Sequence, residues 1–228
     1  MSAGFRVLSR KRMVSPEMVE RARALPVANV SDVMARMSAG GATLRPMHAG
    51  GVMAGPALTV KTRPGDNLMV HKALDMAVAG DVIVVDAGGD LTNAIIGELM
   101  LAQAVKRGVA GIVIYGAIRD AAAIRASHLP VFAAGVTHRG PYKDGPGEIN
   151  GSIAIGGMAI EAGDLVLGDE DGILAIAFAD VATVIGAAEA KQAAEGAQMA
   201  AIEAGTLDRA WVDASLRRLG CEMPEGKP

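Results

Sequence analysis

The sequence predicts an α/β fold in which helices flank a central mixed β-sheet. Residues 97–107 have the apolar spacing of a helix, and 110–115 follow as a nearly all-apolar run rich in β-branched residues, which is typical of a buried parallel strand. Residues 81–86 form a second run of this kind. Three further apolar runs lie too close together for intervening helices and predict antiparallel or mixed pairing: 152–155, 165–167 and 173–176.

Residues 1–26 are expected to form an N-terminal arm and a helix. The arm, residues 1–14, is expected to be flexible or loosely docked. In the segment 15–17 a serine can cap a helix and a proline takes its first position, and Pro26 stops that helix. A second helix is expected to begin near residue 29 or 31 and to run to residue 37.

A strand, a turn and a helix are expected between residues 52 and 79. The strand covers 52–62 and is expected to be interrupted at Pro56, by a bulge or at a sheet edge. The turn at 64–67 precedes a helix over 68–79. His71 lies inside this helix, where a lone histidine is more typical of a hydrogen-bonded structural residue than of a ligand. Its closeness to the turn leaves a ligand role open.

The central segment of the chain combines a helix N-terminus with an exposed Arg-Asp pair. A helix beginning near Gly97 leaves its first amide groups, including those of Leu99 and Met100, without partners inside the helix, and such amides attract an anion. Arg119-Asp120 follows the strand 110–115 at its carboxyl end, where ligands of open α/β sheets usually bind.

The side chains of this segment suit a bound oxo acid and a cation. Arg119 can donate two hydrogen bonds to a carboxylate or an enolate oxygen. Asp120 and Glu98 offer hard oxygen ligands to a divalent cation. The plainer interpretation is a surface ion pair together with a glutamate that is favourable beside the helix dipole.

Several later segments leave two interpretations open. The turns 86–90 and 169–172 are acidic enough to bind a cation, although a polar turn is the more usual structure. The connection 137–150 is long for a segment without secondary structure, which indicates a functional or interface loop. In an alanine-rich helix over 179–204, Glu195 falls on the apolar stripe and would need a partner, a cation or a wet pocket. An exposed glutamate beside a glycine is the alternative.

The composition excludes several classes of protein. The 228 residues are 51% hydrophobic and 3% aromatic, so the core must consist of aliphatic side chains, methionine and alanine. A net charge of −3 gives no electrostatic case for a nucleic-acid partner. No apolar run approaches the roughly 18 residues of a membrane span, so no membrane partner is expected. The lone Cys221 and the absence of a secretory signal predict a cytoplasmic location.

Glu98, then twenty residues, then Arg119-Asp120 resembles the acidic-X20-Arg-Asp signature of the RraA-like family. Five further blocks resemble the family in order: 64–67, 80–86, 108–111, 163–166 and 169–172. The resemblance covers residues 27–205, and it implies a single α/β domain of the swivelling β/β/α type. We therefore expect a catalytic domain over 27–205. The remaining 206–228 are expected to form a tail that docks on the same or a neighbouring subunit.

The resemblance implies a divalent-metal-dependent pyruvate aldolase acting on 4-hydroxy-4-methyl-2-oxoglutarate or a similar 2-oxo acid, with oxaloacetate decarboxylation as a side activity. It implies that Asp120 binds Mg²⁺ (or Mn²⁺ or Co²⁺) directly. Glu98 would hold metal-bound water, as would Glu195 from a neighbouring subunit. Arg119 would bind the keto or enolate oxygen. The backbone at Gly97, Leu99 and Met100 would bind the substrate carboxylate.

These roles require a homo-oligomer, for which the family implies a trimer or a hexamer. In similar aldolases the first acid is often Asp, so Glu98 is one methylene longer. No lysine belongs to the constellation, which disfavours a Schiff-base route.

Two other functions compete with the aldolase. The first is a non-enzymatic regulator that binds a ribonuclease or another protein, as the namesake of the family does. Such regulators tend to lack the full acid set, which is present here. The second is a methyltransferase of menaquinone biosynthesis. The sequence has no glycine-rich loop after a first strand with an acidic residue on the next strand, as nucleotide-type cofactor binding would require.

Overall fold

The computed structural model describes residues 4–38 and 40–223, which divide into two compact units, Met1–Glu189 and Ala190–Pro228. The centre of the first unit is a run of four neighbouring parallel strands: β3 (Met53–Thr62), β4 (Val82–Asp86), β6 (Gly111–Ile118) and β7 (Val131–Val136). Three helices connect them in succession: α3 (Leu68–Met76), α4 (Glu98–Arg107) and α5 (Ala121–Ala126). The carboxyl ends of the strands therefore meet at one edge of the sheet.

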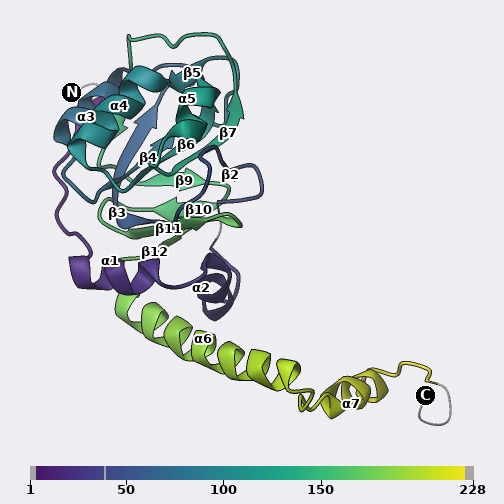
Figure 1. Ribbon diagram of the computed structural model, residues 1–228. Helices are drawn as coiled ribbons and strands as arrows, with labels where there is room; N and C mark the ends of the chain where they lie inside the picture. The colour runs from purple at the N-terminus through teal and green to yellow at the C-terminus, as the bar shows by residue number, and fades with distance from the viewer. Residues whose placement is uncertain (1–3, 39, 224–228) are drawn as a thin grey trace. The chain divides into compact units, whose positions relative to one another are not determined.

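The two faces of this sheet bury two separate cores. On one face, Leu58, Ile83 and Ile112 pack with the apolar sides of α3, α4 and α5, and Figure 1 shows these helices gathered on one side of the sheet. On the other face, Val82 and Val84 pack against a second layer of strands. Because successive side chains of a strand point to opposite faces, one all-apolar run such as that of β4 supplies both cores.

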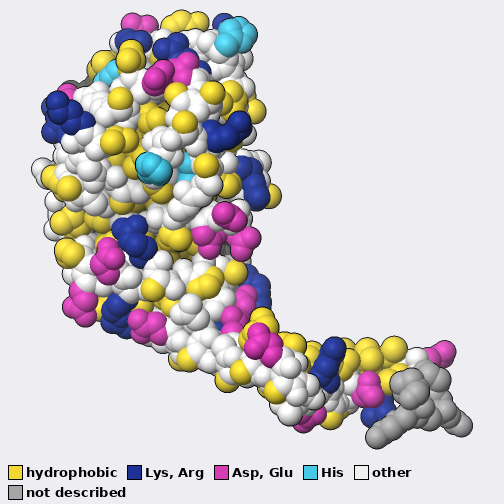
Figure 2. All heavy atoms as spheres, viewed as in Figure 1, with side chains coloured by type: hydrophobic (Ala, Val, Ile, Leu, Met, Phe, Trp, Pro, Cys, Tyr) yellow, Lys and Arg dark blue, Asp and Glu magenta, His cyan; other side chains and the backbone are white. Residues whose placement is uncertain are grey.

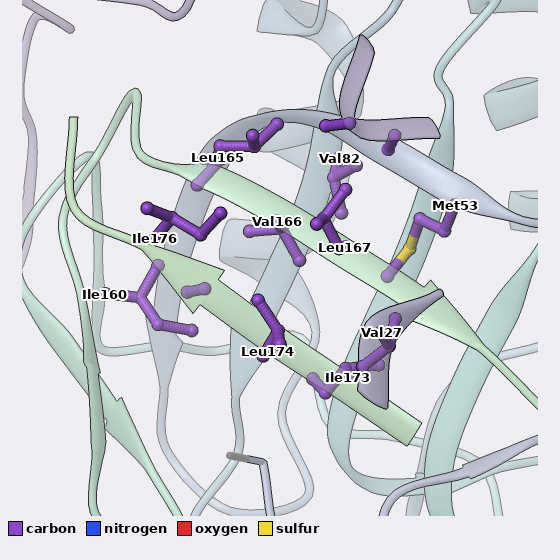
Figure 3. Packing of buried hydrophobic residues seen from close by; sticks show 14 of the residues in the cluster. Val27, Met53, Val82, Ile160, Leu165, Val166, Leu167, Ile173, Leu174 and Ile176 are labelled. Carbon is purple, nitrogen blue, oxygen red and sulfur yellow. The ribbon is translucent and has the colours of Figure 1, made fainter. Parts of the chain in front are cut away.

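The second layer consists of short antiparallel strands. The pair β11 (Leu165–Asp169) and β12 (Gly172–Ile176) joins the main sheet through β3, and β9 (Ile153–Ile155) with β10 (Met158–Ile160) forms a two-stranded sheet. Figure 3 shows Leu165, Leu167 and Leu174 packed with Val82 and Met53 of the main sheet. This layer confirms the predicted mixed sheet.

The remaining elements complete the first unit. Helices α1 (Pro16–Arg23) and α2 (Val27–Val33) contribute to the core beneath β11 and β12. Short strands extend the sheet: β1 (Arg6–Val7), β2 (Arg45–Pro46), β5 (Ala94–Ile96) and β8 (Gly147–Ile149). Helix α6 (Val181–Glu203) begins in the first unit, and the second unit contains α7 (Ala210–Arg218). None of the described helices combines the length and apolar character that a membrane span requires.

Several predicted boundaries are wrong. Helix α2 begins at Val27 because the carbonyl of Pro26 already accepts the first helical N–H bonds. It ends at Val33 because Ala35 and Arg36 adopt left-handed φ angles of 55° and 60°. Helix α3 stops at Met76 instead of residue 79. The long connection after β7 is shorter than predicted, since β8 occupies its last part.

The prediction that Pro56 interrupts the strand is also wrong. The strand runs unbroken from Met53 to Thr62 inside the sheet. The parallel ladder with β4 starts at the pair Ala57 and Val82, one residue after the proline. Pro56 therefore lies beyond the end of the ladder with β4, and on the antiparallel ladder with β11 it pairs with Leu165.

The N-terminal arm is docked more firmly than the sequence predicts. Its β1 pairs with β8, and Arg10 Nη1 lies 2.6 Å from Oδ1 of Asp81, a carboxylate with no exposed surface. The second oxygen of Asp81 accepts the N–H of Val78 at 3.0 Å. A buried carboxylate that keeps its charge needs such partners, so this ion pair ties the arm to the start of β4.

We predict that Arg10→Met lowers the free energy of unfolding by about 3 kcal/mol, because it leaves the buried Asp81 carboxylate without its cation. Urea unfolding of the purified variant measures this change. Lys11→Met is the matched control, since the adjacent Lys11 is exposed and forms no ion pair within the described residues. Equal stability of the two variants would contradict the interpretation.

Candidate functional site

The candidate site lies where β6 ends beside the beginning of α4. The N–H of Arg119 donates to the carbonyl of Ile96 at 3.0 Å, and Oδ2 of Asp120 accepts the N–H of Glu98 at 2.9 Å. Asp120 adopts a left-handed backbone conformation, with φ 54° and ψ 41°, which turns the chain out of the strand. A non-glycine residue in this region is uncommon and is often found at functional sites.

Gly97 makes this close approach possible. A Cβ atom at this position would clash with Oδ2 of Asp120 and would lie 2.9 Å from Cγ and 3.0 Å from Nε of Arg119. The backbone of Gly97 is extended, with φ −147°, so the glycine is needed for space and not for its conformational freedom. Replacing it would displace the two residues that the sequence singles out.

Gly97→Ala is predicted to lower the free energy of unfolding by about 1–3 kcal/mol through this overpacking. Gly186→Ala is the control, because a Cβ at this α6 position meets nothing within 4 Å and alanine favours a helix by up to about 1 kcal/mol. Thermal unfolding of both variants gives the comparison. An unchanged or raised stability of Gly97→Ala would mean that the site tolerates the extra methyl group.

A pocket of about 130 Å³ opens beside this junction. Four of the residues predicted from the sequence line it: Gly97, Leu99, Met100 and Arg119. The N-cap residue of α4, Gly97, has no side chain to cap the helix, and the first N–H, that of Glu98, is taken by Asp120. The next amides of the first turn lack partners within the helix. The pocket therefore combines a guanidinium group with the positive end of a helix dipole, which favours an anionic ligand.

A further part of the pocket wall holds four residues for which the sequence predicted no binding role, except that a ligand role was left open for His71. They come from α3, the turn before it and the connection 137–146: Asn67, His71, Pro141 and Lys143. The length and polarity of the predicted connection were the available signal for Lys143. His71 was expected to be a hydrogen-bonded structural residue, but it is half-buried in this wall and its ring has no hydrogen-bond partner among the described residues.

The polar groups of this wall are incompletely paired. Asn67 is 2% exposed, and its Nδ2 donates to the carbonyl of Ile95 at 2.9 Å, while its Oδ1 has no partner in the described structure. Burial lowers the pKa of His71, and the positive charge of Lys143 lowers it further, against an opposing effect of Asp75. His71 is therefore neutral at neutral pH.

A buried carboxylate holds the two halves of the wall together. Asp66 has no exposed surface, and its Oδ2 accepts the N–H groups of Asp144 at 2.7 Å and Gly145 at 2.9 Å. Its Oδ1 accepts the N–H of Leu68 at the start of α3 at 2.9 Å. Asp66 thus connects the helix that carries His71 to the loop that carries Lys143.

Two of the three acids predicted to bind a cation, Glu98 and Asp120, lie at this site. Glu98 and Asp120 share the junction between α4 and β6, and both are exposed. The Arg119 Nε and Asp120 Oδ2 atoms are 3.6 Å apart, in a pair whose side chains are each 42% exposed. Two carboxylates suit a hard divalent cation, which takes its other ligands from substrate and water. Within the described residues, no group of three or more His, Cys, Asp or Glu could hold a metal ion.

Glu195 is exposed in this chain, which is one of the two alternatives that the sequence left open. Of the apolar stripe of α6, Val181 and Ala188 are buried in the first unit. Glu195 belongs to the second unit, is exposed, and forms an ion pair with Lys191 at 2.7 Å. The stripe continues in the sequence beyond the last buried residue of the helix, Ala188.

The two acidic turns have structural partners. Asp86 Oδ1 accepts the N–H of Gly88 at 3.0 Å, and Asp169 Oδ1 accepts the N–H of Asp171 at 3.0 Å. The second oxygen of Asp169 accepts the N–H of Val27 at 2.9 Å, where α2 begins. These carboxylates act as turn and helix caps. Figure 2 shows acidic and basic side chains interspersed on the visible face of the first unit, in keeping with the small net charge.

Comparison with known proteins decides the family. The Aldolase/RraA model of the RraA-like family matches residues 27–175. This chain belongs to the RraA-like family. A protein of Halalkalibacterium halodurans with the provisional name 4-hydroxy-4-methyl-2-oxoglutarate aldolase is 40% identical over 186 residues, which are 82% of this chain and 89% of that protein.

Solved structures share the fold. An uncharacterized protein from Pseudomonas syringae pv. tomato superposes with a TM-score of 0.77 at 23% identity, covering 86% of this chain and 96% of that one. Streptomyces coelicolor RraAS2, described as an unusual member of the RNase ES inhibitor RraA protein family, gives a TM-score of 0.75 at 25% identity, covering 82% and 98%. The RraA-like family thus joins proteins named for an aldolase and for a ribonuclease inhibitor.

Proposed function

We propose that this RraA-like protein is a divalent-metal-dependent aldolase. It would cleave 4-hydroxy-4-methyl-2-oxoglutarate or a similar 2-oxo acid to pyruvate and a second keto acid. The observation that carries the proposal is the pocket that Arg119 and the first turn of α4 both line, beside the carboxylate of Asp120, which accepts the N–H of Glu98. The name of the Halalkalibacterium halodurans relative supports a carbon-carbon lyase.

The reaction breaks the bond between C3 and C4 of the substrate. The C4 hydroxyl gives up its proton and becomes the carbonyl of the second keto acid. The electron pair of the broken bond stays on the pyruvyl part as an enolate, and C3 then takes up a proton. 4-Hydroxy-4-methyl-2-oxoglutarate yields two molecules of pyruvate in this way. The barrier falls when the negative charge of the enolate is stabilised.

The residues of the pocket match this charge. Arg119 would donate hydrogen bonds to the keto oxygen, which becomes the enolate oxygen. The amides of Leu99 and Met100 would bind the substrate carboxylate at the start of α4. Decarboxylation of oxaloacetate forms the same enolate, so we expect it as a side activity.

The carboxylates would hold a divalent cation. Asp120 would bind Mg²⁺, Mn²⁺ or Co²⁺ directly, and Glu98 would hold its water ligands. When bound, such an ion supplies Lewis-acid stabilisation of the keto and carboxylate oxygens. Two carboxylates at the site of one chain favour a further ligand from elsewhere, for which we propose Glu195 of a neighbouring subunit in a homotrimer or hexamer. Residues 27–205 would then form the catalytic domain and 206–228 a docking tail.

Arg119→Ala is predicted to lower kcat for pyruvate release by about a hundredfold or more, because it removes the donor to the enolate oxygen. A coupled lactate dehydrogenase assay with 4-hydroxy-4-methyl-2-oxoglutarate and Mg²⁺ measures the rate. Arg125→Ala on α5 is the matched control, an exposed arginine that is absent from the pocket wall. Excess EDTA is expected to abolish release by the unmodified protein.

Pyruvate release from oxaloacetate alone would keep the enolate-forming site and reassign the substrate. Release that persists in EDTA, or that Arg119→Ala leaves unchanged, would contradict the proposed site. A folded protein that releases pyruvate from neither substrate with Mg²⁺ would favour the alternative function, a regulator that binds a ribonuclease or another protein. The likeness to RraAS2 supports that alternative.

A further inference from the structure

We infer that Asn93 is a positioning residue for Arg119: it holds the segment 137–142 against the Arg119 guanidinium and thereby fixes the direction of the N–H donors of that group. The inference rests on the proposed function, in which Arg119 binds an enolate oxygen. Asn93 belongs neither to the site predicted from the sequence nor to the residues that line the pocket. It would act on the reaction only through the arginine.

The backbone of the segment 137–142 approaches the end of the Arg119 side chain. A Cβ atom at Gly140 would lie 3.3 Å from Nη1 of Arg119. Further back along the side chain, a Cβ atom at Gly97 would lie 2.9 Å from Cγ and 3.0 Å from Nε. Two glycines therefore bound the guanidinium and the chain that leads to it. Because the side chain of Arg119 is still 42% exposed, its position depends on these backbone segments and not on burial.

Backbone hydrogen bonds hold the segment 137–142 on both sides of this contact. On one side, the N–H of Ala94 at the start of β5 donates to the carbonyl of Arg139 at 2.9 Å. On the other side, the N–H of Tyr142 donates to the carbonyl of Gly65 at 2.8 Å, in the turn before α3. The residue that touches the guanidinium thus lies between two fixed points of the chain.

Asn93 is the side chain that fixes Gly140 itself. Its Nδ2 donates to the carbonyl of Gly140, and the residue is only 8% exposed. A Cβ atom at Gly65 would lie 3.2 Å from Cβ of Asn93, so the turn before α3 packs against the asparagine. Because a closely packed side chain keeps its rotamer, this hydrogen bond places the carbonyl of Gly140 and with it the chain beside Nη1 of Arg119.

Strand β5 supports both ends of Arg119. The N–H of Arg119 donates to the carbonyl of Ile96 at 3.0 Å, and Ile96 is the last residue of β5. Asn93 directly precedes the first residue of the same strand. One short strand therefore holds the backbone of Arg119 directly and its guanidinium through Asn93 and Gly140. A donor that is held in place before the substrate binds needs no reorganisation when negative charge develops on the enolate oxygen.

Oxalate and pyruvate test the inference without any cleavage. Oxalate is a planar dianion with the shape of the pyruvate enolate, and it carries negative charge where pyruvate has a neutral keto oxygen. Isothermal titration in the presence of Mg²⁺ gives both dissociation constants. Asn93→Ala is expected to weaken oxalate binding about tenfold, the effect of one misplaced charged hydrogen bond. It should weaken pyruvate binding less than about twofold, because a neutral oxygen gains less from the guanidinium.

A double-mutant cycle separates positioning from a structural role. Arg119→Ala removes the group through which Asn93 acts, so adding Asn93→Ala to it should weaken oxalate binding no further. A structural loss would weaken binding equally in both backgrounds. Thr92→Val is the matched control for Asn93, since Thr92 is exposed and its hydroxyl donates to Asp90. Lys72→Met controls for the charge that Arg119→Ala removes, because Lys72 is exposed and absent from the pocket wall.

Gly140→Ala disturbs the same guanidinium without a change at Asn93, because its methyl group would lie 3.3 Å from Nη1 of Arg119. It should also weaken oxalate binding, and it takes the place of Asn93→Ala in the cycle if thermal unfolding shows that Asn93→Ala is not folded. Arg119-dependent oxalate binding that neither variant weakens, or an effect that persists in Arg119→Ala, would overturn the inference and leave the proposed function standing. Oxalate binding that Arg119→Ala leaves unchanged would overturn both. The expected cycle without cleavage of any 4-hydroxy-2-oxo acid would keep the inference and refute the aldolase.

Discussion

The candidate site depends on the close approach of β6 to the start of α4. Parallel pairing of β4, β6 and β7 brings the carboxyl ends of the strands to one edge, and the hydrogen bond from the N–H of Glu98 to Asp120 joins that edge to the helix. Gly97 permits the contact because it has no side chain. A guanidinium, a carboxylate and a helix N-terminus thereby converge, although each arises from ordinary α/β geometry.

A second constraint is the buried carboxylate of Asp66. It accepts hydrogen bonds from the backbone of α3 and from the loop that carries Lys143. Charge without solvent is costly unless it is fully hydrogen-bonded, so the surrounding chain can vary little. The first constraint positions the groups that would stabilise an enolate. The second positions the part of the pocket wall that α3 and the connection 137–146 supply. The two parts of the pocket wall thus have separate structural supports.

The sequence predicted the parts of the site that are local. Gly97, Glu98, Arg119 and Asp120 were recognisable because helix ends and strand ends have residue signatures. Lys143 was not, because its place in the pocket wall depends on hydrogen bonds such as that between Asp66 and Asp144, 78 residues apart, which no spacing reveals. The prediction for Pro56 was wrong for a related reason, because the end of the ladder between β3 and β4 is set by the neighbouring strand. The mixed sheet itself followed from the apolar runs.

Exchange of the methyl protons of pyruvate with D₂O tests the central claim most directly, because it needs only the enolate-stabilising half of the pocket. Proton NMR of pyruvate with the protein and Mg²⁺ should show loss of the methyl signal at a rate proportional to protein concentration. Arg119→Ala should abolish it, whereas Lys72→Met should not. Exchange that is absent from the folded, Mg²⁺-supplied protein, or that persists in Arg119→Ala, would contradict an enolate site at the end of β6.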